Sequence, residues 1–70
     1  MRISARNTLK GTIKKIAIGA VNAEVVIELP GGDQVISIVT KEAVASLGLV
    51  EGATAYAIIK ASNVMIGVDH

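Results

Sequence analysis

The chain has 70 residues, a formal net charge of +1 and 51% hydrophobic residues. This length allows one domain, residues 1–70, and a core this small is marginal on its own. There is no cysteine, and the one histidine is the last residue, His70. These counts exclude disulfides and disfavour thiolate or imidazole zinc sites, so no bare metal cation is expected. Since so small and apolar a scaffold needs other support, we expect a homo-oligomer.

Two classes of partner are disfavoured. No apolar run is long enough to span a bilayer, and residues 1–7 carry charge with no apolar stretch behind them, unlike a signal peptide. The absence of cysteine is consistent with a reducing compartment, so we expect a cytoplasmic protein that contacts no membrane. A general nucleic-acid binder is basic and stacks bases on aromatic side chains, whereas this chain is near neutral and has only Tyr56. No nucleic-acid partner is therefore expected.

The first half of the chain predicts three strands. Residues 8–18 form the first, in which Gly11 permits a bend or bulge. Residues 22–29 alternate between apolar and polar side chains, which predicts a strand with one wetter face. A turn signal at residues 30–33 makes a hairpin with residues 34–40, whose β-branched side chains predict a strand covered on both faces.

The one good helix signal follows directly, at residues 41–47. Thr40 has a side chain that caps helix N-termini, and Gly48 adopts the left-handed conformation that ends a helix. Residues 54–60 and 63–68 then predict two further strands. We therefore expect an all-β fold, a five-stranded OB-like Greek-key barrel with one short helix between strands three and four. An SH3-like barrel has a similar signature and stays open as an alternative.

No enzyme is expected, because acid–base or nucleophilic catalysis needs titratable groups placed together. The doublet Gly31-Gly32 belongs to a hairpin turn and does not precede a helix, so it is no phosphate-binding loop. The internal acids are best interpreted as solvated surface groups on strand faces, turns and the helix: Glu24, Glu28, Asp33, Glu42 and Glu51.

Oxyanion binding fits the remaining polar residues better. Ser4 and Arg6 place a hydroxyl and a guanidinium on the same side of an extended chain. Thr40 opens a helix, whose free N–H groups attract anions. Lys60 and Ser62 repeat the cation and hydroxyl pair at a strand end. A site built only of donors suits a fully deprotonated tetrahedral dianion and resists a protonated anion, whose own O–H would lack an acceptor.

Each of these side chains also has a more ordinary interpretation. Taken singly, Arg6 suits a surface ion pair, Lys60 a solvated strand end and Thr40 a simple helix cap, while Ser4 and Ser62 suit loop hydroxyls. The residues alone therefore indicate a small oligomeric β-barrel that binds an anion, and no particular ligand.

Several short motifs occur in a fixed order along nearly the whole chain. They are Ser4-Ala5-Arg6-Asn7 with Leu9 and Gly11, Ala23-Glu24-Val25, Ile38-Val39-Thr40, Leu47-Gly48-Leu49 with Glu51-Gly52, and Ile59-Lys60-Ala61-Ser62 with Val64-Met65-Ile66. Together they resemble the Mop family, the molbindins, which are oxyanion-binding domains of the Mop or TOBE type. Similar units are appended to molybdate-responsive regulators and to importer ATPases, and the length here resembles a free-standing unit.

The resemblance implies an OB-like barrel that assembles as a hexamer, a trimer of dimers. It implies that molybdate or tungstate is held between subunits for intracellular storage or homeostasis. An alternative from another class is a molybdate-sensing interaction module that acts through a partner protein.

The resemblance also implies two kinds of oxyanion site. The second kind, near a three-fold axis, maps to the turn Gly19-Ala20-Val21-Asn22. At position 43, where some relatives carry a hydroxyl residue, this chain has alanine, so only a backbone contact remains there. The first kind, between paired subunits, maps to the donors already named, with two backbone N–H groups added: Ser4, Arg6, Thr40, Ala43, Val44, Lys60 and Ser62.

Overall fold

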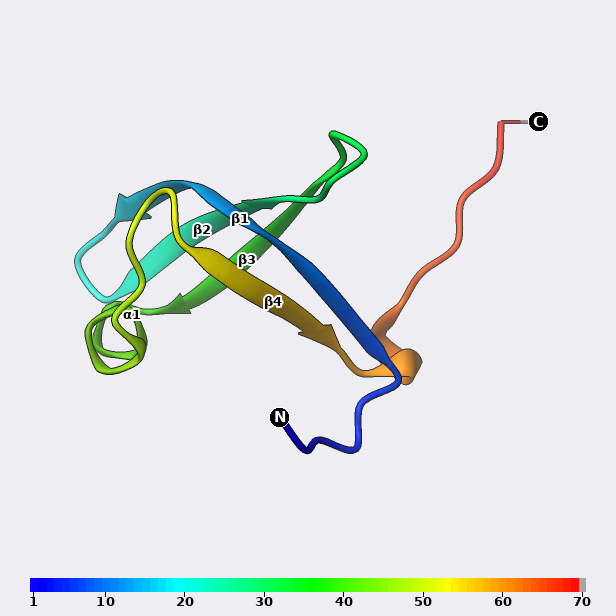
Figure 1. The fold of residues 1–70 in the computed structure, drawn as a ribbon, viewed down its shortest axis with the longest axis horizontal. Helices are drawn as coiled ribbons and strands as arrows, with labels where there is room; N and C mark the ends of the chain where they lie inside the picture. The colour runs from blue at the N-terminus through cyan, green and yellow to red at the C-terminus, as the bar shows by residue number, and fades with distance from the viewer. Residues whose placement is uncertain (70) are drawn as a thin grey trace.

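A computed structural model describes residues 1–69, and His70 lies outside the described residues. The elements along the chain are β1 (Asn7–Ile18), β2 (Asn22–Glu28), β3 (Gln34–Thr40), α1 (Lys41–Leu47), β4 (Thr54–Ile59) and a short 3-10 helix, η1 (Ala61–Asn63). The strands form one curled antiparallel sheet in the order β3-β2-β1-β4 (Figure 1). Within residues 1–69, the structure contains no helix with the length and hydropathy to cross a membrane.

The long strand β1 pairs with two neighbours. Its first half, residues 7–12, pairs with β4, and its second half, residues 12–18, pairs with β2. The register with β2 shifts between Ile13 and Lys15, so that Lys14 is the extra residue of a bulge. The Ile16 N–H beyond this bulge donates to a carboxylate oxygen of Glu51, at 3.0 Å.

The sequence predicted a bend or bulge at Gly11, but the bulge of β1 lies at Lys14. Gly11 therefore has another role. A Cβ atom at position 11 would lie 2.6 Å from the backbone oxygen of Glu28 and 2.6 Å from Cγ2 of Ile27. Glycine is therefore needed for the close approach of β1 to the end of β2.

The core is small and lies inside the curl of the sheet. Its buried side chains are Ile13, Val25, Ile27 and Ala57, which come from three strands. Partly buried residues from β3, α1 and the following loop pack around them, among them Val44. The alternation of β2 is thus confirmed on its inner face.

The predicted helix and its caps are confirmed. Helix α1 spans Lys41–Leu47, and the Thr40 hydroxyl accepts a hydrogen bond from the Ala43 N–H at 3.0 Å. Gly48 ends the helix in the left-handed conformation, with φ 64°. The helix lies between the third and fourth strands, as predicted.

The predicted fifth strand is not formed, so the prediction of a five-stranded barrel is wrong for the single chain. After η1, residues 64–69 pair with no strand in the described part of the chain, although the backbone at Val64 is extended (φ −88°, ψ 122°). The side chains of Met65 and Ile66 are 93% and 92% exposed. The physical reason is that the segment leads away from the sheet and reaches neither edge (Figure 1).

The prediction that β3 is covered on both faces is also wrong within one chain. Ile36 and Ile38 on its outer face are 63% and 62% exposed, while the residues that alternate with them, Val35, Ser37 and Val39, are half-buried. No described element of the chain packs over that outer face. The strand β3 therefore carries more apolar surface than the single chain covers.

Replacing Gly11 with alanine tests the close approach of β1 and β2. We expect Gly11→Ala to lower the free energy of unfolding by about 1–3 kcal/mol, the usual cost of overpacking, because the backbone of Glu28 must move. Gly31→Ala is the matched control, since a Cβ there meets nothing within 4 Å. Urea unfolding at one protein concentration measures both, and equal midpoints would contradict the role of Gly11.

Candidate functional site

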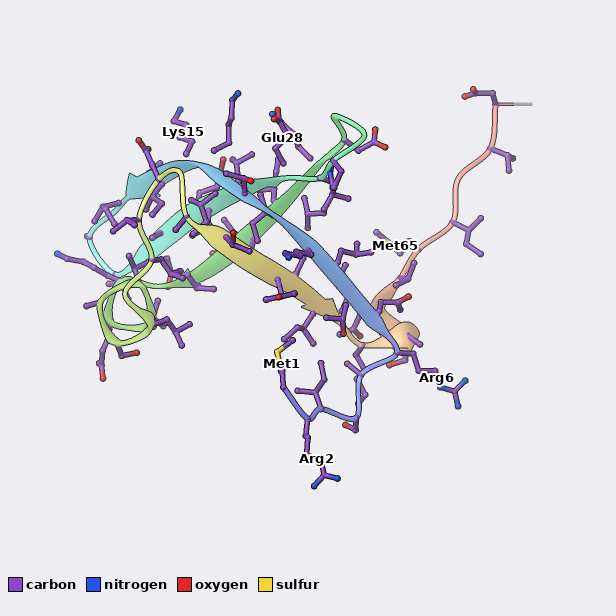
Figure 2. All side chains as sticks on the ribbon, in the orientation of Figure 1. Met1, Arg2, Arg6, Lys15, Glu28 and Met65 are labelled. Atoms are coloured by element: carbon purple, nitrogen blue, oxygen red, sulfur yellow. The ribbon has the colours of Figure 1, made fainter. Side chains whose placement is uncertain are left out.

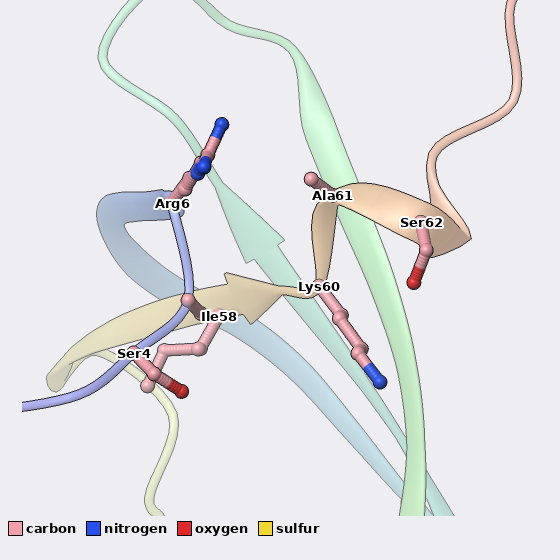
Figure 3. Close-up of a pocket in the computed structure, with 7 residues that line it drawn as sticks. Ser4, Arg6, Ile58, Lys60, Ala61 and Ser62 are labelled. Atoms are coloured by element: carbon pink, nitrogen blue, oxygen red, sulfur yellow. The ribbon is translucent and has the colours of Figure 1, made fainter.

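A pocket forms where the chain enters β1 and leaves β4. Because these strands are antiparallel and Asn7 lies opposite Ile59, the residues before β1 meet the residues after β4. The Asn7 side-chain amide also donates to the Ile59 carbonyl oxygen, at 3.3 Å. The cavity measures about 550 Å³ and is lined by Ser4, Ala5, Arg6, Ile58, Lys60, Ala61 and Ser62 (Figure 3).

The structure thus brings together four of the predicted site residues from opposite ends of the chain. They are Ser4, Arg6, Lys60 and Ser62. Two carry positive charge and two carry hydroxyls, and no carboxylate lines the cavity. Within residues 1–69, the ion pair that forms joins Lys14 to Glu28 at 3.7 Å, away from this pocket. The two cations therefore remain available to an anionic ligand.

The side chains do not all point the same way. In Figure 3 the hydroxyls of Ser4 and Ser62 and the ammonium of Lys60 point to one side, whereas the guanidinium of Arg6 points to the other. The prediction that Ser4 and Arg6 share a side is therefore wrong in the single chain. The reason is local, because residues 4 and 6 form bends and the extended strand begins at Asn7.

The remaining residues predicted for the first site, Thr40, Ala43 and Val44, lie at the start of α1. The Ala43 N–H is already used by the cap with Thr40, and the Lys41 N–H donates to the Val21 carbonyl oxygen at 2.8 Å. Asn22 pairs with Thr40, so the turn at residues 19–22 lies directly beside the helix start. The residues predicted for the second site and the helix part of the first site are therefore neighbours.

The helix start and the pocket lie at opposite ends of the molecule. Figure 1 shows α1 at one end and η1 at the other. They are separated along β1, which has 12 residues and so extends roughly 35 Å at the usual rise per residue. One small oxyanion cannot contact both groups within one chain.

Three residues that line the pocket were not predicted as site residues, namely Ala5, Ile58 and Ala61, although both alanines belong to the family motifs. Ile58 is half exposed and lies in β4 two residues before Lys60. Side chains two apart in a strand share a face. Extending the alternation of β4 to Lys60 would have indicated Ile58.

A curled antiparallel sheet with one helix after its third strand, and a cationic pocket at one end, defines a small β-domain with a candidate anion-binding site. Residues 3–66 match the TOBE domain family. A probable molybdenum-pterin-binding protein of Haemophilus influenzae is 52% identical over 69 residues, which cover 99% of this chain and 100% of that protein. The chain therefore belongs to the TOBE family and, within it, to the Mop proteins, which confirms the resemblance seen in the sequence.

Two solved structures are similar along nearly the whole chain. MopII from Clostridium pasteurianum superposes with a TM-score of 0.90 and 45% identity, covering 96% of this chain and 100% of that one. ModG, described as a cytoplasmic molybdate-binding protein and solved with molybdate bound, gives a TM-score of 0.93 and 62% identity. This chain covers 49% of ModG, with 99% of its own length aligned.

Thr40 offers a test that separates its structural role from ligand binding. We expect Thr40→Ala to lower the free energy of unfolding by about 0.5–2 kcal/mol without any ligand, because the Ala43 N–H loses its acceptor. Thr40→Ser keeps a hydroxyl and should retain most of the stability. Urea unfolding of the three proteins measures the difference, and an unchanged Thr40→Ala would show that the cap contributes nothing.

Proposed function

We propose that this protein binds molybdate or tungstate without catalysis, at sites between subunits of a homo-oligomer, for intracellular storage or homeostasis. The observation that carries the proposal is the pocket in which Arg6 and Lys60 meet Ser4 and Ser62 with no carboxylate among the lining residues. Membership of the Mop proteins supports this ligand, since a 62% identical structure holds molybdate.

The chemistry of the pocket favours a dianion. Ammonium and guanidinium groups form charge-assisted hydrogen bonds, which are stronger than neutral ones, and serine hydroxyls add further donors. A tetrahedral oxyanion without protons can accept from the Lys60 ammonium and the two serine hydroxyls, which point to one side, and from the exposed Arg6 guanidinium if that side chain turns towards them. Molybdate and tungstate share charge and shape, so the same donors serve both.

A second copy of the chain completes the proposed site. The predicted site residues at the start of α1, Thr40, Ala43 and Val44, are too far from the pocket in one chain to share its ligand. The Ala43 N–H donates to the Thr40 hydroxyl here, so it would have to change partner to bind an oxyanion. If the helix start of one copy approaches the pocket of another, both groups surround one oxyanion. The hexamer implied by the family resemblance, a trimer of dimers, would provide such contacts.

We also propose that the turn at residues 19–22 contributes to a second oxyanion site. Gly19, Ala20 and Asn22 lie beside the helix start, because Asn22 pairs with Thr40.

The likeness to a cytoplasmic molybdate-binding protein supports a cytoplasmic location for the whole assembly.

Isothermal titration with molybdate tests the ligand, with sulfate as the comparison anion. We expect binding of molybdate in preference to sulfate, and a ratio of sites to chains that is not a whole number if some sites are shared on symmetry axes. Equal heats from both anions, or none from either, would exclude this function.

Charge-removing variants test the residues of the pocket. We expect Lys60→Gln and Arg6→Ala to weaken molybdate binding by about tenfold to a hundredfold, as loss of a hydrogen bond to a charged group costs about 1.5–3 kcal/mol. Lys14→Gln and Lys14→Ala remove the same charge at an exposed site that pairs with Glu28, and should bind like the wild type. Equal affinities in all four variants would contradict the assignment.

A ligand that binds only the assembled protein stabilises the assembly by mass action. We therefore expect molybdate to raise the melting temperature, by an amount that grows with the logarithm of its concentration above Kd. Thermal unfolding with molybdate or sulfate at equal ionic strength measures this shift. No shift at saturating molybdate would contradict the coupling between ligand and assembly.

A further inference from the structure

The cationic pocket has one apolar wall. Among the residues that line it, Ala5, Ile58 and Ala61 carry no polar side-chain atom, and Ile58 is the only large one of these three. Ile58 lies in β4, and its side chain is 46% exposed. A large hydrocarbon group is therefore open to solvent in the same cavity as the hydroxyls and cations that can bind an anion.

The backbone of β4 fixes Ile58 at this wall. Ile58 lies two residues before Lys60, where the backbone is still extended (φ −62°, ψ 131°), so the two side chains share one face. Figure 3 shows the Ile58 side chain pointing to the same side as the Ser4 hydroxyl and the Lys60 ammonium. The Arg6 side chain extends outward on the other side, and Figure 2 shows it projecting away from the sheet. Ile58 therefore faces the same space as two of the donors.

An apolar wall affects dianions of different size unequally. An anion that enters the pocket exchanges water for the donors of the protein, and a hydrocarbon side chain offers no hydrogen bond in place of the water that it displaces. For a given charge, the free energy needed to remove hydration rises as the ion becomes smaller. Sulfate is smaller than molybdate and carries the same charge, so it loses more hydration free energy beside such a wall.

We propose that Ile58 is a specificity-determining residue, which disfavours sulfate because its side chain excludes the water that a small dianion needs. This inference rests on the proposed oxyanion binding and deepens it. The cations and hydroxyls of the pocket attract any dianion, so they do not separate sulfate from molybdate. The cavity of about 550 Å³ is much larger than a tetrahedral anion, so steric fit within one chain does not separate them either.

A second groove provides a matched control residue. It lies between the outermost strands of the sheet, β3 and β4, each of which has one edge without a partner strand, and its volume is about 300 Å³. Ile58 lines this groove as well as the pocket, whereas Ile36 lines the groove and is absent from the pocket. Ile36 is 63% exposed, so a change there tests the same chemistry outside the proposed site.

Competition between the two anions tests the proposal. Ile58→Thr keeps a β-branched side chain, which suits a strand, and places a hydroxyl at the apolar wall. We expect the ratio of the sulfate Kd to the molybdate Kd to fall by roughly tenfold, the lower end of the discrimination that one apolar group provides in a pocket. Displacement of molybdate by sulfate in isothermal titrations at constant ionic strength measures this ratio. A loss of stability or assembly that weakens both anions equally leaves the ratio unchanged.

Two variants control for size and for the groove. Ile58→Val shortens the side chain but keeps it apolar, and Ile36→Thr makes the same polar change in the groove alone. We expect both variants to keep the wild-type ratio. An unchanged ratio in Ile58→Thr, or an equal fall in either control, would overturn the role of Ile58 and leave the proposed function standing. A wild-type protein that binds neither anion would overturn the proposed function itself.

The heat capacity change of molybdate binding gives a second measurement, which needs no sulfate. Covering apolar surface on binding makes this change negative. If the anion displaces water from the Ile58 side chain, we expect the change to be less negative in Ile58→Thr than in the wild type, and unaltered in Ile36→Thr. Titrations at several temperatures measure it, and equal values in all three proteins would contradict the contact between the anion and Ile58.

Discussion

The shared use of β1 is the constraint on which the rest of the structure depends. One 12-residue strand pairs with β4 along its first half and with β2 along its second half, and Thr12 is the residue of β1 that pairs with both strands. The sheet must therefore twist along β1 and curl, and the bulge at Lys14 adds to the bend. Gly11 lets the two backbones approach closely at the point where the pairing changes from one neighbour to the other.

This arrangement places the polar residues of the chain in two groups. Antiparallel pairing of β1 and β4 joins the two ends of the chain and creates the pocket with Arg6 and Lys60. Pairing of β2 with β3 joins the turn at residues 19–22 to the helix start. Neither group surrounds a small anion completely. The proposed sites between subunits therefore follow from the separation of these two groups within one chain.

Local signals in the sequence predicted local structure well. The helix at residues 41–47, its cap at Thr40 and its end at Gly48 depend on neighbours in the chain, and the structure confirms them. The meeting of Arg6 with Lys60 depends on the register of β1 and β4, which no local pattern fixes. The donor chemistry therefore named these residues as candidates, and the family motifs assigned them to one site.

Two of the wrong predictions, the fifth strand and the covered outer face of β3, share a physical explanation. The patterns at residues 34–40 and 63–68 indicate apolar segments with strand propensity, and only the first forms a strand in the single chain. A pattern of this kind does not say which part of a structure covers the segment. In the single chain, Ile38 and Ile66 both remain exposed. Hydrophobic periodicity carries no information about what covers an apolar face.

Tyr56 has a practical consequence of a different kind. The chain has no tryptophan and no phenylalanine, so this tyrosine is its one aromatic side chain. It lines the groove between β3 and β4 and is 46% exposed. Ile58, two residues further along β4, lines both that groove and the cationic pocket. The aromatic absorption, the near-ultraviolet circular dichroism and the intrinsic fluorescence of the protein therefore all originate from Tyr56. The protein therefore carries a native optical reporter beside the open edges of its sheet, and following that region requires no added label.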